Sequence, residues 1–524
     1  MHEEATRDTP AIAPAPDEAL THARPPAADP ANGGAPTPGA ARPSRLPRLK
    51  RPPRALAALM GAAFLLAVAW ALVIPPFHAP DEDEHYVYSQ SLAENLSLPP
   101  SHSWTTRGPQ LSPAVRTAEQ YARTRLFWKP QGSAVRPPWD SFAVREYTAA
   151  LHRLSSAQLS HVDSAANQGG DPPLYHAWEA VAYRLTPSSS PFSRLFVMRL
   201  WSALLILLTV AGAWLLAGEV LGRDRTLQLL AAGCVGLHPM ITFMSSGVNP
   251  DAGAYAASAF VLWLGVRVIR RGPSRENVVG LLAALAVMGL MKVSTLTMAP
   301  AVGLALFIAA RRAHVRLSGG WRRWLAGAAG LAVAAGLVLA TTRHSLKYVL
   351  RPSQTGGFLS YLWQYYLPRL PSQKPVPQLP AHAFYSIWFK GAWAEFGWRE
   401  LAFPAAVYKV LAGVSAATFL GAGLALIRRR LRIDRAVVGF LAAAAVGLVL
   451  GLHVAEYYAE HRWGGPINEG RYLLALLPIA GLAVAVAVMN LARRWRSLAT
   501  AVVLGAMLVL NLFSLGLAAG AFYA

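Results

Sequence analysis

The sequence predicts an all-α polytopic membrane protein, and three observations support this prediction. Of the 524 residues, 54% are hydrophobic and only 15% are charged, which is typical of a chain that lies in lipid. Apolar runs of about 20 residues, long enough to cross a hydrocarbon core of about 30 Å, recur along the chain. Arginines gather at the ends of these runs, as the positive-inside rule predicts for cytoplasmic loops. We therefore expect a bundle of about eleven transmembrane helices.

The charge balance and the cysteine content further limit the kinds of partner and site that the protein can have. The 49 Lys and Arg against 27 Asp and Glu give a net charge of +22, which in a water-soluble chain would indicate a nucleic-acid partner. Here the position of the arginines beside apolar runs explains the charge, so we expect no nucleic acid. The single cysteine, Cys234, excludes an intrachain disulfide and Cys-based metal sites.

The chain begins with a polar segment and a first apolar run. Residues 1–54 are rich in Pro and Ala, show no apolar period and end in a basic stretch, which predicts a disordered cytoplasmic tail. The following run, ALAALMGAAFLLAVAWALVI, is long for a signal peptide and no small-residue cleavage site follows it. We interpret it as an uncleaved anchor whose N-terminus is inside, and residues 55–524 as one transmembrane domain.

The remaining apolar runs place the other spans. They are expected near 195–217, 227–245, 251–269, 277–295, 297–311, 324–341, 404–427, 436–454, 472–491 and 498–519. The loops near 218–226, 268–276, 312–323, 428–435 and 492–497 are then cytoplasmic, and most of them are dense in Arg, as the positive-inside rule predicts. The least certain boundary runs from Lys292 to Arg311, where Pro300 interrupts a short span.

This orientation exports two long loops, at 75–194 and 342–403. Both far exceed the usual connection of about 4 to 6 residues. We therefore expect them to be structured, with short helices, and to carry the function on the extracytoplasmic side.

The first exported loop opens with an acidic motif, PPFHAPDEDEH. Pro80 and Asp81 can open a helix, which places Asp81 and His85 at i and i+4 on one face. A carboxylate there can serve as a general base, and Asp81, Glu82 and His85 can also hold a divalent cation such as Mg²⁺ or Mn²⁺. A solvated acidic helix start is the simpler alternative.

Two further positions lie at the same predicted end. In the turn Asn249-Pro250-Asp251, either Asp251 faces a cavity or the turn is ordinary helix-start chemistry. Lys292 near the end of an apolar run either binds a phosphate or reaches out of the lipid to water.

Two late segments complete the candidate residues. YSIWFKGAWAEFGWRELAFP places aromatic rings such as Trp398 beside charged groups such as Lys390, which suits either an interfacial belt or the face of a sugar. PINEGRYLLALLP places Glu469, Arg471 and Tyr472 at the start of an apolar helix. Arginine on this face runs against the positive-inside bias, so capture of an anionic lipid headgroup competes with simple snorkelling.

These motifs, taken in order, resemble a known family. PPFHAPDEDEH, DPPLYHAWEAVAYRL, NPDA, LMKVSTL, FKGAWAEFGW and EGRYLLALLP resemble the motifs of the bacterial polytopic family called domain of unknown function 2142, over roughly residues 55–490. That family is similar to the GT-C superfamily of polyprenyl-phosphate-sugar-dependent glycosyltransferases. The resemblance implies a GT-C-like bundle in the bacterial inner membrane, with an extracytoplasmic active site.

The resemblance also implies partners and roles. A polyprenyl-phosphate-linked sugar donor would place its phosphate near Arg471 and Lys292, and Asp81 would deprotonate a glycan or lipid acceptor. Tyr175 and His176 would shape the acceptor side, together with the aromatic stretch that ends at Trp398.

The sequence departs from the family's pattern at two positions. His78 stands where an amide is expected, and Glu469 stands where Gln is expected. The extra charge of Glu469 beside Arg471 changes the setting of the phosphate partner.

Two other classes remain open. A flippase or exporter of lipid-linked saccharide would use the same basic and aromatic groups, but its transport path would need polar residues across the core. If the chain were a binding or scaffold protein of the envelope, the acidic motif would have no assigned function. The charged candidates instead gather at one end of the spans, which favours the transferase.

Overall fold

A computed structural model describes residues 53–96, 98, 112–122, 141–155, 158–159, 171–188, 190–222, 224–313, 357–377, 379–428, 433–463 and 469–523. The predicted tail, apart from its last two residues, and the predicted span 324–341 lie outside these ranges. Pro52–Ala524 forms one compact unit.

The first part of this unit is helical. Its elements are α1 (Arg54–Val73), α2 (Glu82–Asn95), α3 (Pro113–Ala122), α4 (Ser141–His152), α6 (Pro173–Leu185), α7 (Pro191–Ala203), α8 (Leu205–Leu221), α9 (Arg225–Gly236), α10 (Pro239–Ser246), α11 (Asp251–Arg271), α12 (Arg275–Met291), the 3₁₀ helix η3 (Val293–Met298) and α13 (Ala299–Arg312). The four helices α2, α3, α4 and α6 lie within the first predicted exported loop.

The second part adds a small hairpin. Its elements are α15 (Gly357–Tyr366), the π-helix η4 (Phe384–Phe389), α16 (Lys390–Trp393), β1 (Glu395–Phe396), β2 (Leu401–Ala402), α17 (Ala405–Ile427), α18 (Arg435–Trp463), the 3₁₀ helix η5 (Gly470–Leu476), α19 (Leu477–Val488) and α20 (Arg493–Tyr523). The strands pair antiparallel, with Glu395 opposite Ala402 and Phe396 opposite Leu401.

The described helices confirm the polytopic all-α class. Eight of them are long and apolar enough to cross a membrane, or nine if the bent pair α9 and α10 is one span. That pair replaces the single predicted run 227–245, and it bends by 54° because Pro239 at the first position of α10 has no N–H for the helix ladder. The predicted span 277–295 is the 17-residue α12, which is not among these eight, so the count of eleven stays a prediction.

Small residues allow the spans to approach closely. A Cβ on Gly212 of α8 would lie 2.7 Å from the Cβ of Ala259 in α11, and Gly481 of α19 lies against the carbonyl of Ala231 in α9. Such contacts between glycine and alanine are the usual packing of membrane helices, where no hydrophobic effect drives association. They hold α8 against α11 and α9 against α19.

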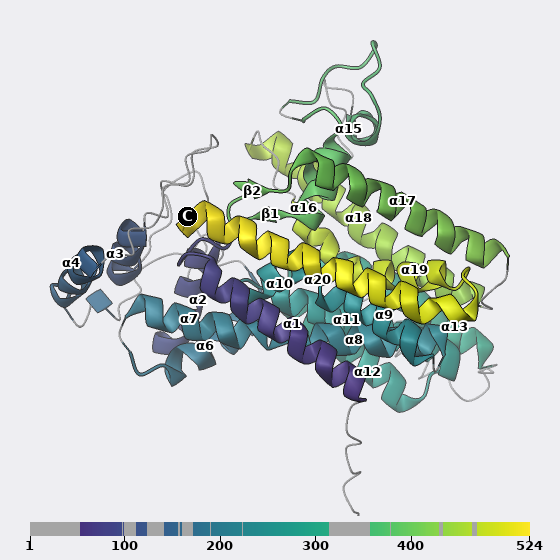
Figure 1. Ribbon diagram of the computed structural model, residues 1–524, viewed down its shortest axis with the longest axis horizontal. Helices are drawn as coiled ribbons and strands as arrows, with labels where there is room; N and C mark the ends of the chain where they lie inside the picture. The colour runs from purple at the N-terminus through teal and green to yellow at the C-terminus, as the bar shows by residue number, and fades with distance from the viewer. Residues whose placement is uncertain are drawn as a thin grey trace, which may run out of the picture. The chain divides into compact units, whose positions relative to one another are not determined.

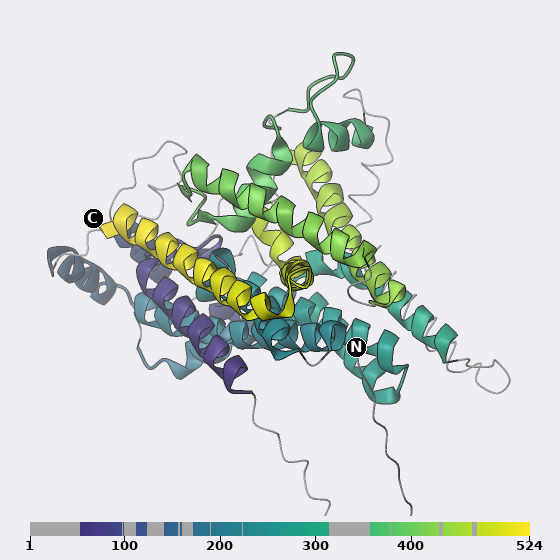
Figure 2. The ribbon, with the colours of Figure 1, turned by 45° about the vertical axis from the view of Figure 1, so that its right-hand side comes forward.

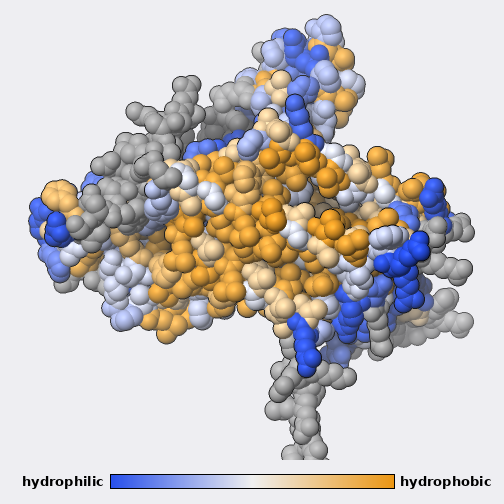
Figure 3. Space-filling model, in the orientation of Figure 1, coloured by the Kyte–Doolittle hydropathy of each residue, from blue (hydrophilic) through white to orange (hydrophobic). Residues whose placement is uncertain are grey.

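The spans have an apolar middle and two different ends. Figure 1 and Figure 2 show α20 lying alongside α1, and Figure 3 shows hydrophobic residues over the middle of these helices and hydrophilic ones toward their ends. Leu65 and Leu72 of α1 are largely exposed, as expected of side chains that face lipid. α11 runs from Asp251 to Arg271, so its acidic and its arginine-rich ends lie about 30 Å apart.

Ion pairs close the arginine-rich end. Nη2 of Arg271 lies 2.7 Å from Oε1 of Glu219, and Arg312 pairs with Asp434. We call the opposite end, which carries Asp81, Asp251 and Arg471, the motif end.

Candidate functional site

The turn before α11 joins three of the sequence motifs. The Nδ2 of Asn249 donates to the carbonyl of Pro80 (2.9 Å), and its Oδ1 accepts from the backbone N–H of Asp251 (2.9 Å). The backbone N–H of Asn249 donates to the hydroxyl of Tyr175 (2.7 Å). The amide of Asn249 therefore fixes the start of α11 against the start of α2, and Tyr175 ties α6 to the same turn.

Asp81 stands at the N-cap of α2 in the left-handed region, with a φ of 57°. Aspartate tolerates this conformation better than most residues, but it still carries strain that a functional site has to hold in place. Its carboxylate does not cap the helix. It points instead to Arg471, whose Nη2 donates to Oδ2 of Asp81 at 3.1 Å.

Arg471 is the centre of the site. Its side chain is only 3% exposed, and its Nε lies 3.0 Å from Oε2 of Glu469 and 3.4 Å from Oδ2 of Asp251. Three carboxylates, Asp81, Asp251 and Glu469, thus share one guanidinium. Within the described part of the chain, the buried Nη1 has no hydrogen-bond partner, although an unpaired buried donor costs about 1 to 3 kcal/mol.

Lys292 adds a second cation. It ends α12, and its ammonium pairs with Asp251. The same ammonium lies 4.4 Å from the ring centroid of Tyr472, close enough for a cation–π contact. Asp251 therefore bridges the two cations, and Tyr472 covers the side of Lys292.

The N-termini of two helices face the same centre. α2 begins after Asp81 and α11 begins at Asp251, and neither has a side-chain cap. The positive ends of these helices add to the charge of Arg471 and Lys292. The electrostatics therefore favour an anionic group beside the cations.

The second predicted exported loop contacts this centre through the close approach of two glycines. A Cβ built on Gly470 would collide with the backbone of Gly391 and Ala392 and with the carbonyl of Trp388. Only glycine allows this approach, which places α16 directly against the residue before Arg471. Oε2 of Glu395 lies 3.2 Å from the Nε of Arg399, and burial together with the charge of Glu469 raises the pKa of Glu395 to about 7.

Glu82 lies next to Asp81 but in a different environment. It is fully buried, and its oxygens accept from Nε (2.7 Å) and Nη2 (2.5 Å) of Arg199. The same guanidinium donates to the carbonyls of Ala71, Ile74 and Pro75, and Glu82 also accepts from the N–H of Val248 (3.1 Å). Arg199 and Glu82 thus bind α7, the end of α1 and the start of α2 together.

His85 and His176 form a buried pair below Asp81. The Nδ1 of His176 lies 3.3 Å from the carbonyl of Pro172, and its Nε2 lies 3.1 Å from Nδ1 of His85. The carbonyl can only accept, so His176 carries its proton on Nδ1, and His85 then donates from its own Nδ1. Burial lowers the pKa of His85, with His176, Lys292 and Arg471 adding to the effect, and lowers the pKa of His176 to about 3. Both rings are therefore neutral, and His85 keeps the lone pair of its Nε2.

The other predicted residues lie around this core. The hydroxyl of Tyr175 lies 2.8 Å from Oγ of Ser202, so this side chain is committed to packing. The ammonium of Lys390 lies 5.4 Å and 5.6 Å from the ring centroids of Tyr385 and Tyr408 rather than beside Arg471. Trp398 lies in the hairpin that follows α16 and is half-buried.

Sequence reasoning missed Arg199 and Asp171. Arg199 stands inside the apolar stretch RLFVMRLWSALL, and a charged residue within a membrane helix is itself a functional signal. Asp171 precedes the two prolines that start α6, and only the fold brings it near Asp81, Asp251 and Lys292, whose charges act on it.

The donor set does not fit a divalent cation. Asp81, Asp251 and Glu469 all point to a guanidinium, so a cation already occupies the place between them. Across the ranges that the structure describes, no group of three or more His, Cys, Asp or Glu is arranged to hold a metal ion.

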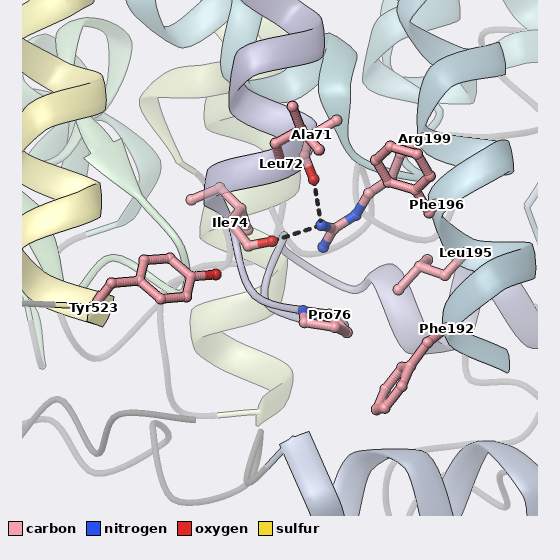
Figure 4. A pocket seen from close by; sticks show the side chains of 9 residues that line it. All are labelled: Ala71, Leu72, Ile74, Pro76, Phe192, Leu195, Phe196, Arg199 and Tyr523. Atoms are coloured by element: carbon pink, nitrogen blue, oxygen red, sulfur yellow. Dashed lines mark hydrogen bonds between the residues drawn. The ribbon is translucent and has the colours of Figure 1, made fainter. Parts of the chain in front are cut away.

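A cavity of about 310 Å³ lies on the far side of Arg199. Figure 4 shows it between the end of α1, the start of α7 and Tyr523 of α20. Its lining is apolar apart from Arg199 and Tyr523, and the guanidinium is saturated by Glu82 and three carbonyls. This cavity is therefore suited to hydrocarbon rather than to an anion.

The spans and the polar centre at one end of them define a polytopic helical membrane protein with a buried, charged site. The chain belongs to the family described as Predicted membrane protein (DUF2142), which matches residues 64–480. This confirms the family that the sequence motifs predict.

The comparison with solved structures gives a distant match. The crystal structure of ArnT from Cupriavidus metallidurans in the apo state aligns with a TM-score of 0.38 and 15% identity. The alignment covers 84% of this chain and 60% of the ArnT chain. A comparison with curated proteins found no match.

Proposed function

We propose that the chain is a GT-C-type glycosyltransferase that moves a sugar from a polyprenyl-phosphate-linked donor to a glycan or lipid acceptor at the extracytoplasmic face. The observation that carries the proposal is Arg471, a buried guanidinium with an unpaired Nη1 among the described residues, beside the partly open carboxylate of Asp81. An anion-binding group and a carboxylate in one centre are what transfer from a phosphate leaving group requires.

In this mechanism the donor phosphate binds Nη1 of Arg471 and the ammonium of Lys292, and two helix N-termini face it. The acceptor hydroxyl lies against Asp81, which takes its proton as a general base. The hydroxyl oxygen bonds to the anomeric carbon while the bond from that carbon to the phosphate oxygen breaks. Polyprenyl phosphate leaves, and the configuration at the anomeric carbon inverts.

Glu82 and His85 then position the base rather than react. Glu82 holds the start of α2 through Arg199, and His85 lies one turn below Asp81, its backbone N–H donating to the carbonyl of Asp81 (3.0 Å). Both residues fix the left-handed turn at Asp81.

The distribution of charge favours this reaction over transport. A flippase needs polar groups along a path across the core. In the described spans the ion pairs lie at the two ends, around Arg471 at one and around Glu219 and Asp434 at the other, so the transferase is the better supported function.

The test is turnover by purified protein with synthetic polyprenyl-phosphate sugars and an envelope-glycan acceptor. Asp81→Asn keeps the shape of the side chain and should reduce kcat by about 100-fold or more, because general-base catalysis contributes about 10² to 10⁴. Glu276→Gln, an exposed change at the arginine-rich end, is the matched control. Full turnover by Asp81→Asn would remove Asp81 from the chemistry, and lack of turnover by the unmutated protein would favour transport or binding.

A further inference from the structure

We infer that Asp171 is a second catalytic carboxylate of this centre, which receives the acceptor's proton from Asp81 and releases it to water. This inference rests on the proposed function and names the group that completes its proton transfer.

The packing of α2 and α6 brings the two carboxylates together. The helices run side by side in the same direction, because His85 bonds His176 near their starts and Nε of Arg184 donates to the carbonyl of Ala93 near their ends (2.6 Å). Their N-terminal ends therefore meet, with Asp81 before one and Asp171 before the other. α12 packs on α6 as well, which brings Lys292 to the same place.

The segment that carries Asp171 is clamped. The hydroxyl of Tyr88 donates to the carbonyl of Asp171 (3.0 Å), and the ring of Tyr88 stacks on His176 at a centroid distance of 3.8 Å. His176 is in turn held by His85 and by the carbonyl of Pro172. Asp171 thus has a fixed backbone although it precedes the helix.

Asp171 differs from its neighbours in its pairing. Asp81, Asp251 and Glu469 are paired with Arg471, and Glu82 with Arg199. In the parts of the chain that the structure describes, the half-buried carboxylate of Asp171 has no ion pair or hydrogen bond. It is therefore the carboxylate that can take up a proton without breaking a salt bridge.

The groups that face Asp171 set its proton affinity. Burial raises its pKa to about 6, the charge of Lys292 acts against this, and the charges of Asp81 and Asp251 add to it. At neutral pH the carboxylate is charged and ready to accept.

The proton balance of the reaction indicates that Asp171 removes the proton from Asp81. When Asp81 takes the hydroxyl proton, its ion pair with Arg471 is lost and has to be restored before the next donor binds. Passing the proton to Asp171, and from there to water, restores the pair. The bonds made and broken at the anomeric carbon are unchanged.

The experiment is the pH profile of kcat for the unmutated protein, Asp171→Asn, Asp171→Glu and Glu276→Gln. The unmutated protein and Glu276→Gln should lose activity as the pH falls through about 6, because protonated Asp171 cannot accept. Asp171→Asn should be about 10- to 100-fold slower at pH 7.5 and should lack this acidic limb, and Asp171→Glu should recover both. Binding of the donor, measured by native mass spectrometry, should be unchanged in Asp171→Asn.

Three results would overturn the inference. One is an Asp171→Asn protein of normal rate with the same acidic limb. Another is an Asp171→Asn protein in which donor binding and rate fall equally, because this would indicate that Asp171 has only a structural role. Absence of turnover by the unmutated protein would overturn the proposed function and this inference together, whereas normal turnover with an unaffected variant would overturn the inference alone. Should Asp171→Asn fail to fold, Tyr88→Phe removes only the clamp and should shift the acidic limb.

Discussion

Two adjacent acidic residues at the start of α2 have opposite environments. The carboxylate of Asp81 is 23% exposed and reaches Arg471, whereas that of Glu82 is fully buried against Arg199. The positive φ at Asp81 turns the chain so that neighbouring side chains point apart. Adjacent positions in a motif can therefore serve chemistry and structure separately.

This difference predicts that Glu82→Gln acts on stability. The change leaves the charge of Arg199 buried without its partner, which costs about 3 to 5 kcal/mol. We expect the free energy of unfolding in detergent to fall by that amount, and turnover by the folded fraction to fall as well, because the start of α2 that carries Asp81 is held less firmly. Asp81→Asn, at a partly exposed pair, should change stability by about 1 kcal/mol or less.

A double variant provides the control. Glu82→Met with Arg199→Met removes both charges and should recover part of the lost stability, because no charge is then left buried without a partner. The recovery stays incomplete, since the carbonyls of Ala71, Ile74 and Pro75 lose their donor. If Glu82→Gln is as stable as the unmutated protein, Glu82 does not stabilise the contact between α7, the end of α1 and the start of α2.

The residue types of the site could be predicted from the sequence, but not their pairing. Asp81 and His85 at i and i+4 follow from helix geometry, and the acidic, basic and aromatic motifs mark most of the centre. The contact between Asp81 and Arg471 spans 390 positions, and no local spacing encodes it. Asp171 was not predicted as a site residue, because a single acidic residue before two prolines is also common at an ordinary helix start.

At the scale of elements, the contact between α16 and η5 depends on two glycines without side chains. Apolar runs and loop charges predict the spans around them well, since both follow from transfer of the chain into lipid. They do not predict the bend between α9 and α10, because averaged hydropathy does not register a missing N–H at Pro239. Nor do they predict the close approach of Gly391 and Gly470, which only folding brings together.

We predict that Gly391→Ala lowers turnover with little loss of fold. A Cβ on Gly391 would lie 2.8 Å from the N–H nitrogen of Gly470 and 3.0 Å from Oε2 of Glu395, so η5 and Arg471 must shift. A displacement of this kind near the reacting groups can cost about 100-fold in rate, measured as kcat with the same donor and acceptor.

Gly413→Ala is the matched control. Gly413 lies in α17, and a Cβ there would meet nothing within 4 Å, so rate should be unchanged and stability equal or slightly higher. Equal rates for Gly391→Ala and Gly413→Ala would show that the approach of the two glycines does not position Arg471.

At the scale of the whole molecule, the alternation of spans is what brings the motifs to one end. The positive-inside rule assigns that end to the outer face, because the arginines of α11 and α13 lie at the other. The polytopic architecture could thus be predicted from composition and loop charge, whereas the side of the membrane depends on the rule alone.

Single-cysteine labelling tests the sidedness. Cys234 is the chain's sole cysteine, so Cys234→Ala gives a background without thiols. In intact cells, a membrane-impermeant maleimide should label Ser372→Cys, an exposed position after α15, and leave Glu276→Cys, in the first turn of α12, unlabelled until the cells are opened. The reverse pattern would place the site in the cytoplasm and exclude an extracytoplasmic reaction.

The sharing of Arg471 among three carboxylates has a consequence for affinity. A phosphodiester that reaches the guanidinium joins three carboxylates already paired with it, and the repulsion between these like charges leaves little net free energy of binding. Capture of a lipid-linked molecule would then depend on its hydrocarbon tail, at about 0.8 kcal/mol for each buried methylene. The headgroup would decide which molecule reacts, and the tail would decide how tightly it is held.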